Sequence, residues 1–349
     1  CIVLCDEYGN VFWGGVIMGR FVNLDNSAFQ AALNSRIYVD KTGLIACMNN
    51  ILDSTDAYIC NSRPRRFGKS YAANMLAAYY SKGASSEEMF SKLDIGKTPD
   101  FKRHLNKYDV IHIDIQWFLT NCEDKDKVVG YITKVVLDEL KDVYPDILPS
   151  EVLSLPDALS RVRNETGRKF VIIIDEWDVL IRDEAANKKV QDDYIRFLRS
   201  MFKGIEPTKY IQLAYLTGIL PIKKERTQSA LNNFREYSML NAGPLASYIG
   251  FTENEVKELC RVYNKDFTEV KRWYDGYQLG AYQVYNPNAV INTMIDGNFQ
   301  SYWSATASYD SIVPLINMDF DGLKTSIIEM LSGALVTVDV ASFQNDISN

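Results

Sequence analysis

Hydrophobic and polar positions alternate along this chain in two ways, which predict two kinds of element. Short apolar runs bounded by polar or turn residues predict buried strands. Between them, apolar residues recur at helical spacing, as in Val128, Val129, Ile132, Val135, Val136 and Leu140. The predicted strands are Ala57–Cys60, Asp109–Ile115, Lys169–Asp175 and Tyr210–Leu216. The predicted helices are Asn26–Asn34, Thr42–Leu52, Ser70–Tyr80, Asp126–Val143, Leu155–Thr166 and Asn187–Lys203.

The strand Lys169–Asp175 is the strongest of these signals. Its residues are apolar on both alternating faces, which is typical of a central parallel strand covered by helices on each side. Strands that alternate with helices predict an α/β sandwich of three layers with a mostly parallel sheet. The carboxyl ends of the strands near residues 61, 175 and 216 should then share one edge, where such sheets bind ligands.

The pattern changes near residue 245, where short helices and aromatic-rich segments begin. We therefore expect a main domain over residues 18–245 and a smaller C-terminal segment over 246–349. Trp273–Tyr277 and Tyr282–Tyr285 predict a hairpin, whose aromatic rings would either stack on nucleic-acid bases or, as we prefer, fill a small satellite core. Residues 1–17 lack a starting Met and read as an expression-derived or upstream segment. The polar end predicts a fragment of a longer protein.

Composition narrows the classes of function. The 349 residues are 47% hydrophobic and 24% charged, with a formal net charge of −7, which argues against coating nucleic acid over a broad face. Six cysteines without a Cys-x-x-Cys pair and only two histidines exclude a clustered zinc site. The cysteines fit reduced thiols in a cytoplasmic protein. No apolar run is long enough to predict a membrane span.

The segment Arg63-Pro64-Arg65-Arg66-Phe67-Gly68-Lys69-Ser70 matches the phosphate-binding loop pattern G-x-x-x-x-G-K-[ST], or Walker A, with Arg63 in the first glycine slot. Gly68 lets the backbone approach phosphate, and the N–H groups that follow point at negative oxygen. Lys69 would reach the β- and γ-phosphates, and the Ser70 hydroxyl would bind Mg²⁺. The alternative, a chance tripeptide in a basic turn, is disfavoured by the strand before the loop and the helix after it. Arg65 and Arg66 would contact phosphate or, as we prefer, stay at the surface.

The acidic end of the strong strand supplies the second half of this site, a Walker B element. Asp175 would hold a Mg²⁺ water opposite Ser70, and Glu176 would orient and deprotonate the attacking water. A capping pair after a buried strand is the alternative, which the upstream phosphate loop disfavours. Asp178 fits a helix cap or a solvated turn better than a second metal ligand.

Further polar residues follow the next strand. Thr217 would either sense the γ-phosphate or cap a turn, and the pattern does not separate these readings. Lys223, Lys224 and Arg226 fit a solvated basic face by default, and a cation supplied to phosphate as the alternative.

In these motifs the sequence resembles the bacterial AAA-ATPase-like family, a divergent P-loop branch near archaeal-type and STAND ATPases. The resemblance runs from about residue 20 to 305 and is carried by Tyr38–Thr42, Arg63–Ser70, Ile174–Asp178, Leu216–Ile219, Leu231–Asn233, Phe251–Glu255, Trp273–Tyr277 and Tyr285–Pro287. Arg in the first slot is habitual in this family. Trp177 departs from its more frequent Asp-Glu-Tyr-Asp motif.

The resemblance implies an ASCE-type core in which the acidic strand lies between the P-loop strand and others. It implies that Asp40 and Lys41 lie near the nucleotide base and that a helical or winged-helix-like segment follows. Family members often carry a PD-(D/E)XK nuclease-like domain further on, but its acidic–lysine signature is not found before Asn349.

The leading hypothesis from these motifs is a Mg–ATP-driven switch or motor that acts on an attached effector, a protein partner or a second copy of the chain. The alternatives are a regulatory module that holds ATP with negligible hydrolysis, and an ATPase coupled to DNA.

Overall fold

The computed structural model describes residues 18–182, 187–222, 231–274 and 276–302, with the short paired strands β1 (Leu4–Cys5) and β2 (Val11–Phe12) and a few isolated positions after residue 302. It divides into two compact units. The first comprises Cys1–Glu258 and Gly276–Pro287, and the second Leu259–Asp275 and Asn288–Asn349. The predicted boundary near residue 245 falls inside the first unit, beside η3 (Gly243–Leu245), and stays a prediction.

The first unit is built on a five-stranded, all-parallel sheet in the order β4-β5-β6-β3-β7. The strands are β3 (Tyr58–Ser62), β4 (Asp109–Asp114), β5 (Phe170–Asp175), β6 (Ile211–Gly218) and β7 (Arg235–Tyr237). The predicted α/β class with a parallel sheet is therefore confirmed. β6 separates the strand before the phosphate loop, β3, from the acidic strand β5, and β7 is a short strand that the pattern did not predict.

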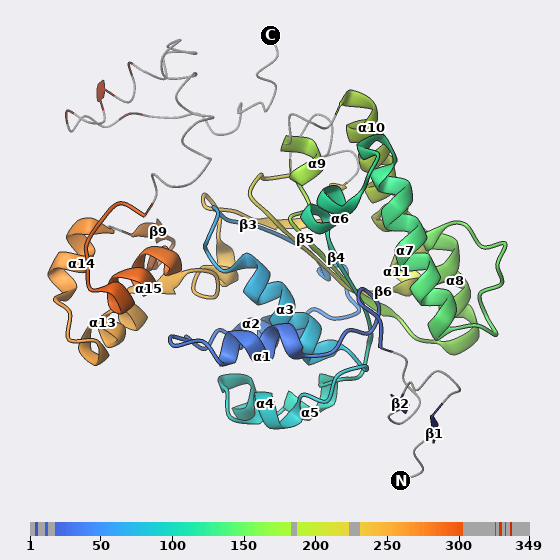
Figure 1. The fold of residues 1–349 in the computed structure, drawn as a ribbon, viewed down its shortest axis with the longest axis horizontal. Helices are drawn as coiled ribbons and strands as arrows, with labels where there is room; N and C mark the ends of the chain where they lie inside the picture. Colours follow the sequence, from blue (N-terminus) through green and yellow to red (C-terminus); the bar gives the residue numbers. More distant parts are fainter. Residues whose placement is uncertain are drawn as a thin grey trace. The chain divides into compact units, whose positions relative to one another are not determined.

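Helices cover both faces of this sheet (Figure 1). On one face lie α1 (Ser27–Leu33), α2 (Gly43–Asn49), α3 (Lys69–Tyr80), α4 (Glu87–Ser91), η1 (Asp94–Lys97) and α5 (Phe101–His104). On the other lie α6 (Ile115–Asn121), η2 (Lys125–Lys127), α7 (Val128–Val143), α8 (Leu155–Thr166), α9 (Val179–Arg182), α10 (Lys188–Phe202) and α11 (Ile205–Tyr210). The residues of β5 alternate between the two cores, which explains why every position of this strand is buried.

Local signals explain several helix ends. Gly167 ends α8 in the left-handed conformation (φ 71°), as its place after the apolar pattern predicts. The Asn187 side chain accepts the Val190 N–H at the start of α10. The predicted strand Asp109–Ile115 ends one residue early, because the Asp114 carboxylate accepts the Trp117 N–H and begins α6.

The C-terminal part adds a small antiparallel sheet to the first unit, and helices of which the first begins in that unit. β8 (Phe251–Thr252), β10 (Tyr282–Tyr285) and β9 (Tyr277–Leu279) pair in that order, and Gly280 (φ 61°) turns the predicted hairpin. The helices are α13 (Glu253–Val262), α14 (Phe267–Trp273) and α15 (Pro287–Asp296), so the expected helical segment is confirmed. Tyr285 is buried in the first unit and Tyr274 in the second, whereas Tyr282 and Trp273 stay half-exposed.

No helix among the described residues is both long enough and apolar enough to cross a bilayer.

Candidate functional site

The phosphate loop joins β3 to α3, as its motif predicts. Gly68 has a φ of 93°, which is left-handed and favours glycine, and open space surrounds the position where a Cβ would lie. No side chain caps the first turn of α3, so its N–H groups keep their capacity to bind an anion. Phe67 is buried, and its ring meets that of Tyr277 at a centroid distance of 5.5 Å. The loop is therefore anchored to β9 while its backbone at Gly68 stays open.

The arginines of the loop take different positions. Arg63 is fully buried, and its guanidinium donates to the backbone oxygens of Ser62 (2.9 Å) and Tyr237 (3.1 Å). Burial lowers the pKa of Arg63 to about 10. This side chain braces β7 against the end of β3. Arg65 and Arg66 are exposed, and Pro64 is partly buried.

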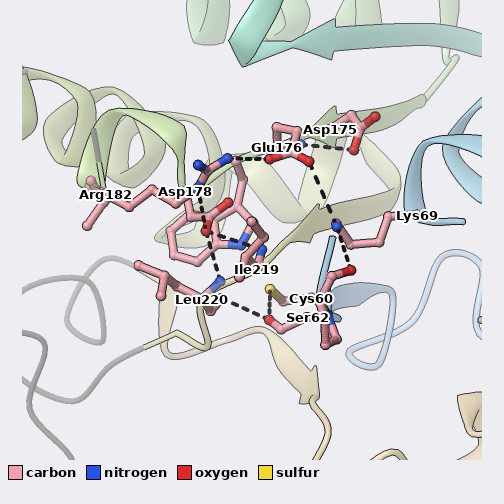
Figure 2. A network of polar contacts seen from close by, with 12 residues as sticks. Cys60, Ser62, Lys69, Asp175, Glu176, Asp178, Arg182, Ile219 and Leu220 are labelled. Atoms are coloured by element: carbon pink, nitrogen blue, oxygen red, sulfur yellow. Dashed lines mark hydrogen bonds and ion pairs between the residues drawn. The ribbon is translucent and has the colours of Figure 1, made fainter. Parts of the chain in front are cut away.

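Lys69 lies at the centre of the site. Its side chain is only 4% exposed, and burial lowers the pKa of its ammonium group. The Nζ atom donates to the Pro64 carbonyl at 3.2 Å and lies 3.8 Å from Glu176 Oε1 (Figure 2). Its positive charge is further favoured by Asp175 and Asp178. A buried cation beside several carboxylates is a ready partner for a phosphate group.

Asp175 ends β5 and is 4% exposed. Burial raises its pKa to about 6, and an interaction with the Ser70 hydroxyl opposes that rise. Ser70 itself is exposed at the start of α3. The pair predicted to share Mg²⁺ is therefore brought together by the fold.

A row of polar side chains crosses the sheet at its carboxyl edge. Asp114, Asp175, Thr217 and Asn61 are register partners on β4, β5, β6 and β3, and the alternation of each strand directs them toward the α3 face. Thr217 is fully buried, and its Oγ1 has no hydrogen-bond partner among the described residues. A strand-end cap would need such a partner, so this orphaned hydroxyl favours the sensor reading.

Glu176 follows in a left-handed conformation (φ 52°), which is unusual for a residue with a side chain. Its N–H donates to Asp175 Oδ1 at 2.9 Å, and the next N–H, of Trp177, donates to the Thr217 carbonyl at 3.0 Å. Its carboxylate lies between Lys69 and Arg182, whose Nη2 is 2.5 Å from Oε2.

The expectation of a solvated Asp178 is wrong, because the residue is fully buried. The expected cap position fits, since Asp178 directly precedes α9 and its carbonyl accepts the N–H groups of Ile181 and Arg182 at 3.0 Å. Asp178 Oδ2 accepts the N–H groups of Ile219 (3.2 Å) and Leu220 (2.8 Å) and lies 3.3 Å from Arg182 Nε. Burial raises the pKa of Asp178, and the Leu220 N–H and the Arg182 guanidinium limit the rise. Sequence reasoning missed Arg182 and Asp114. Their signals were an Asp–Arg spacing of four residues and a polar residue at a strand's carboxyl end.

The carboxylate of Asp40, expected near the nucleotide base, accepts hydrogen bonds from nearby protein groups. Its oxygens accept from the Thr42 N–H and hydroxyl (2.8 and 2.7 Å) and from the Asp94 N–H (2.7 Å). Lys41 donates to the Ser247 carbonyl and to Glu255. Contact of Asp40 with a base stays a prediction. Lys223, Lys224 and Arg226 lie outside the described residues.

Comparison with known proteins agrees with this arrangement. The family described as Predicted AAA-ATPase matches residues 28–227. One curated relative, described as "Uncharacterized protein in vnfD 5'region" of Azotobacter chroococcum mcd 1, is 25% identical over 283 residues. The aligned part covers 80% of this chain and 52% of the relative, so the chain spans about half the relative's length. Because the family match takes in more than half of the 349 residues, the chain belongs to the AAA-ATPase-like family of P-loop proteins.

Proposed function

We propose that this chain binds Mg–ATP at the carboxyl edge of β3, β5 and β6 and hydrolyses it to drive a switch or motor. The observation that carries the proposal is the approach of Lys69 Nζ to Glu176 Oε1, 3.8 Å apart, beside the buried Asp175. Phosphoryl transfer needs positioned charges more than covalent chemistry, and this arrangement supplies them.

Each residue has a distinct part in this proposal. Lys69 and the N–H groups of the loop and of α3 bind the β- and γ-phosphates. Ser70 and Asp175 bind Mg²⁺, which neutralises charge on the phosphates when bound. Glu176 orients the attacking water and accepts its proton, and Thr217 donates its free hydroxyl to the γ-phosphate or to that water.

The donor set fits Mg²⁺ held jointly by protein, phosphate and water. Within the described ranges, no group of three or more His, Cys, Asp or Glu residues is arranged to hold a metal by itself. A hydroxyl and one carboxylate, Ser70 and Asp175, are the few protein oxygens that Mg²⁺ usually takes beside substrate phosphates.

A nucleotide-holding module with negligible hydrolysis is the second candidate. It is favoured by the carboxylate of Glu176, which is already paired with Arg182 at 2.5 Å and with Lys69 at 3.8 Å. A carboxylate held between two cations is less free to accept a proton from water.

Phosphate release and nucleotide binding separate the two candidates. We expect Mg-dependent turnover in the wild type, loss of binding and turnover in Lys69→Ala, and retained binding with turnover reduced to a small residual rate in Glu176→Gln. Lys92→Ala and Glu88→Gln, from an exposed pair 3.4 Å apart, are matched controls that should behave as wild type. Tight binding with equally negligible turnover in wild type and Glu176→Gln would establish the module instead.

A further inference from the structure

Arg182 connects the two acidic groups that follow β5. Its Nη2 lies 2.5 Å from Glu176 Oε2, and its Nε lies 3.3 Å from Asp178 Oδ2 (Figure 2). Arg182 and Glu176 are 20% and 22% exposed, and Asp178 is fully buried. Nη2 donates a hydrogen bond to Glu176, whereas Nε contacts Asp178 as an ion pair without hydrogen-bond geometry. One guanidinium therefore contacts both carboxylates at once.

Asp178 carries this connection to the end of β6. It accepts the N–H groups of Ile219 and Leu220, the second and third residues after Thr217. The two segments are in close contact, because a Cβ on Gly218 would lie 2.5 Å from Asp178 Oδ1 and 2.7 Å from the Trp177 ring. A displacement of the backbone just after β6 would therefore also displace Asp178 and its partner Arg182.

The backbone of Glu176 does not by itself determine where its carboxylate lies. The left-handed turn is held by the Asp175 side chain and the Thr217 carbonyl, but the side chain has further rotatable bonds. The two cations that contact this carboxylate differ in distance and in their other contacts. Lys69, at 3.8 Å, is the cation that a γ-phosphate would engage, whereas Arg182 is closer and is already tied to Asp178.

We propose that Arg182 is the positioning residue for Glu176 and couples it, through Asp178, to the backbone of Ile219 and Leu220. This inference rests on the proposed hydrolysis. When the Lys69 ammonium binds a nucleotide phosphate instead of Glu176, Arg182 remains as the cation that keeps the Glu176 carboxylate in place. Through Asp178, the same guanidinium also contacts the segment just after Thr217. The Glu176 carboxylate is therefore fixed in position relative to the end of β6.

The test compares Arg182→Ala and Arg182→Lys with wild type in steady-state ATP hydrolysis. Arg161→Ala is the matched control, since Arg161 pairs with Asp157 at the same four-residue spacing on α8, but at the surface. We expect kcat to fall by about tenfold to hundredfold in Arg182→Ala, with KM unchanged, because misplacing a base costs rate rather than ground-state binding. Arg182→Lys should lie between, since one amine cannot bridge both carboxylates.

A double-mutant cycle makes the assignment specific. In a Glu176→Gln background, Arg182→Ala should lower kcat little further, because the group that it positions is gone. An unchanged kcat in both Arg182 variants, or a full additional loss in the Glu176→Gln background, would overturn the inference and leave the hydrolysis standing. If Arg182→Ala does not fold, Arg182→Lys decides the question. No turnover in the wild type would overturn hydrolysis and inference together.

Discussion

Asn in place of Asp175 should stabilise the nucleotide-free protein while removing its response to Mg–nucleotide. The carboxyl group is 4% exposed, and burial raises its pKa from 3.8 to about 6. The Ser70 hydroxyl and Lys69 lower this pKa, whereas Asp114 and Glu176 raise it. The folded protein therefore holds an ionised carboxylate at neutral pH at a cost in stability, which a neutral amide of the same size avoids.

The size of this stability cost follows from the pKa values of Asp175 in the unfolded and the folded state. The folded state binds the proton of the Asp175 carboxyl more tightly than the unfolded state does. The contribution of this protonated carboxyl to the free energy of unfolding is therefore fully present below pH 3.8. It is lost as the pH rises through about 6. With about 1.4 kcal/mol for each tenfold change in proton affinity, ionisation of Asp175 costs about 3 kcal/mol at pH 7 and above.

Urea unfolding, followed by circular dichroism in EDTA without nucleotide, measures this cost. We expect Asp175→Asn to exceed the wild type in unfolding free energy by about 3 kcal/mol near pH 8, with the difference shrinking toward pH 4. Asp138→Asn, from an exposed pair with Lys134 on α7, is the control and should change little. Added Mg–ATP should stabilise the wild type more than the variant. A variant no more stable than wild type near pH 8 would refute this account of Asp175.

Two further substitutions test contacts around the site by the same unfolding measurement. Gly218→Ala should cost about 1–3 kcal/mol by overpacking, since its Cβ would lie 2.5 Å from Asp178 Oδ1 and 2.7 Å from Trp177 Cδ1; an unchanged urea midpoint would contradict this contact. Glu255→Ala should cost about 1–3 kcal/mol by unpairing a charged group, because the Lys41 ammonium, 2.6 Å away, loses its carboxylate and burial already lowers its pKa. A variant as stable as wild type would show that this pair contributes nothing.

Several elements follow from local pattern alone. The apolar run before Asp175 could be read as a buried parallel strand because its period and composition need no knowledge of its neighbours. Likewise, α8 and the left-handed Gly167 follow from helical spacing and a glycine at the right place. The phosphate loop is a contiguous string, and its strand and helix come from the adjoining residues.

Other elements could not be read in this way. β7 is only three residues long, and it is a strand because β3 offers it a partner. The strand order, with β6 between β3 and β5, is decided by which surfaces pack together and leaves no mark in any one segment.

The sequence by itself determined the class of fold and the placing of the phosphate-loop motif and the acidic strand end at one carboxyl edge, because these depend on short-range spacing. Only the tertiary structure decided the roles of the remaining charged groups. Arg63 stands in the first slot of the phosphate-loop motif and donates to the Tyr237 carbonyl of β7, Asp178 looks solvated but is buried, and Arg182 gives no signal except its spacing. Burial and ion pairing depend on residues far apart in the chain, so the partners of a charged side chain appear only once the sheet has assembled.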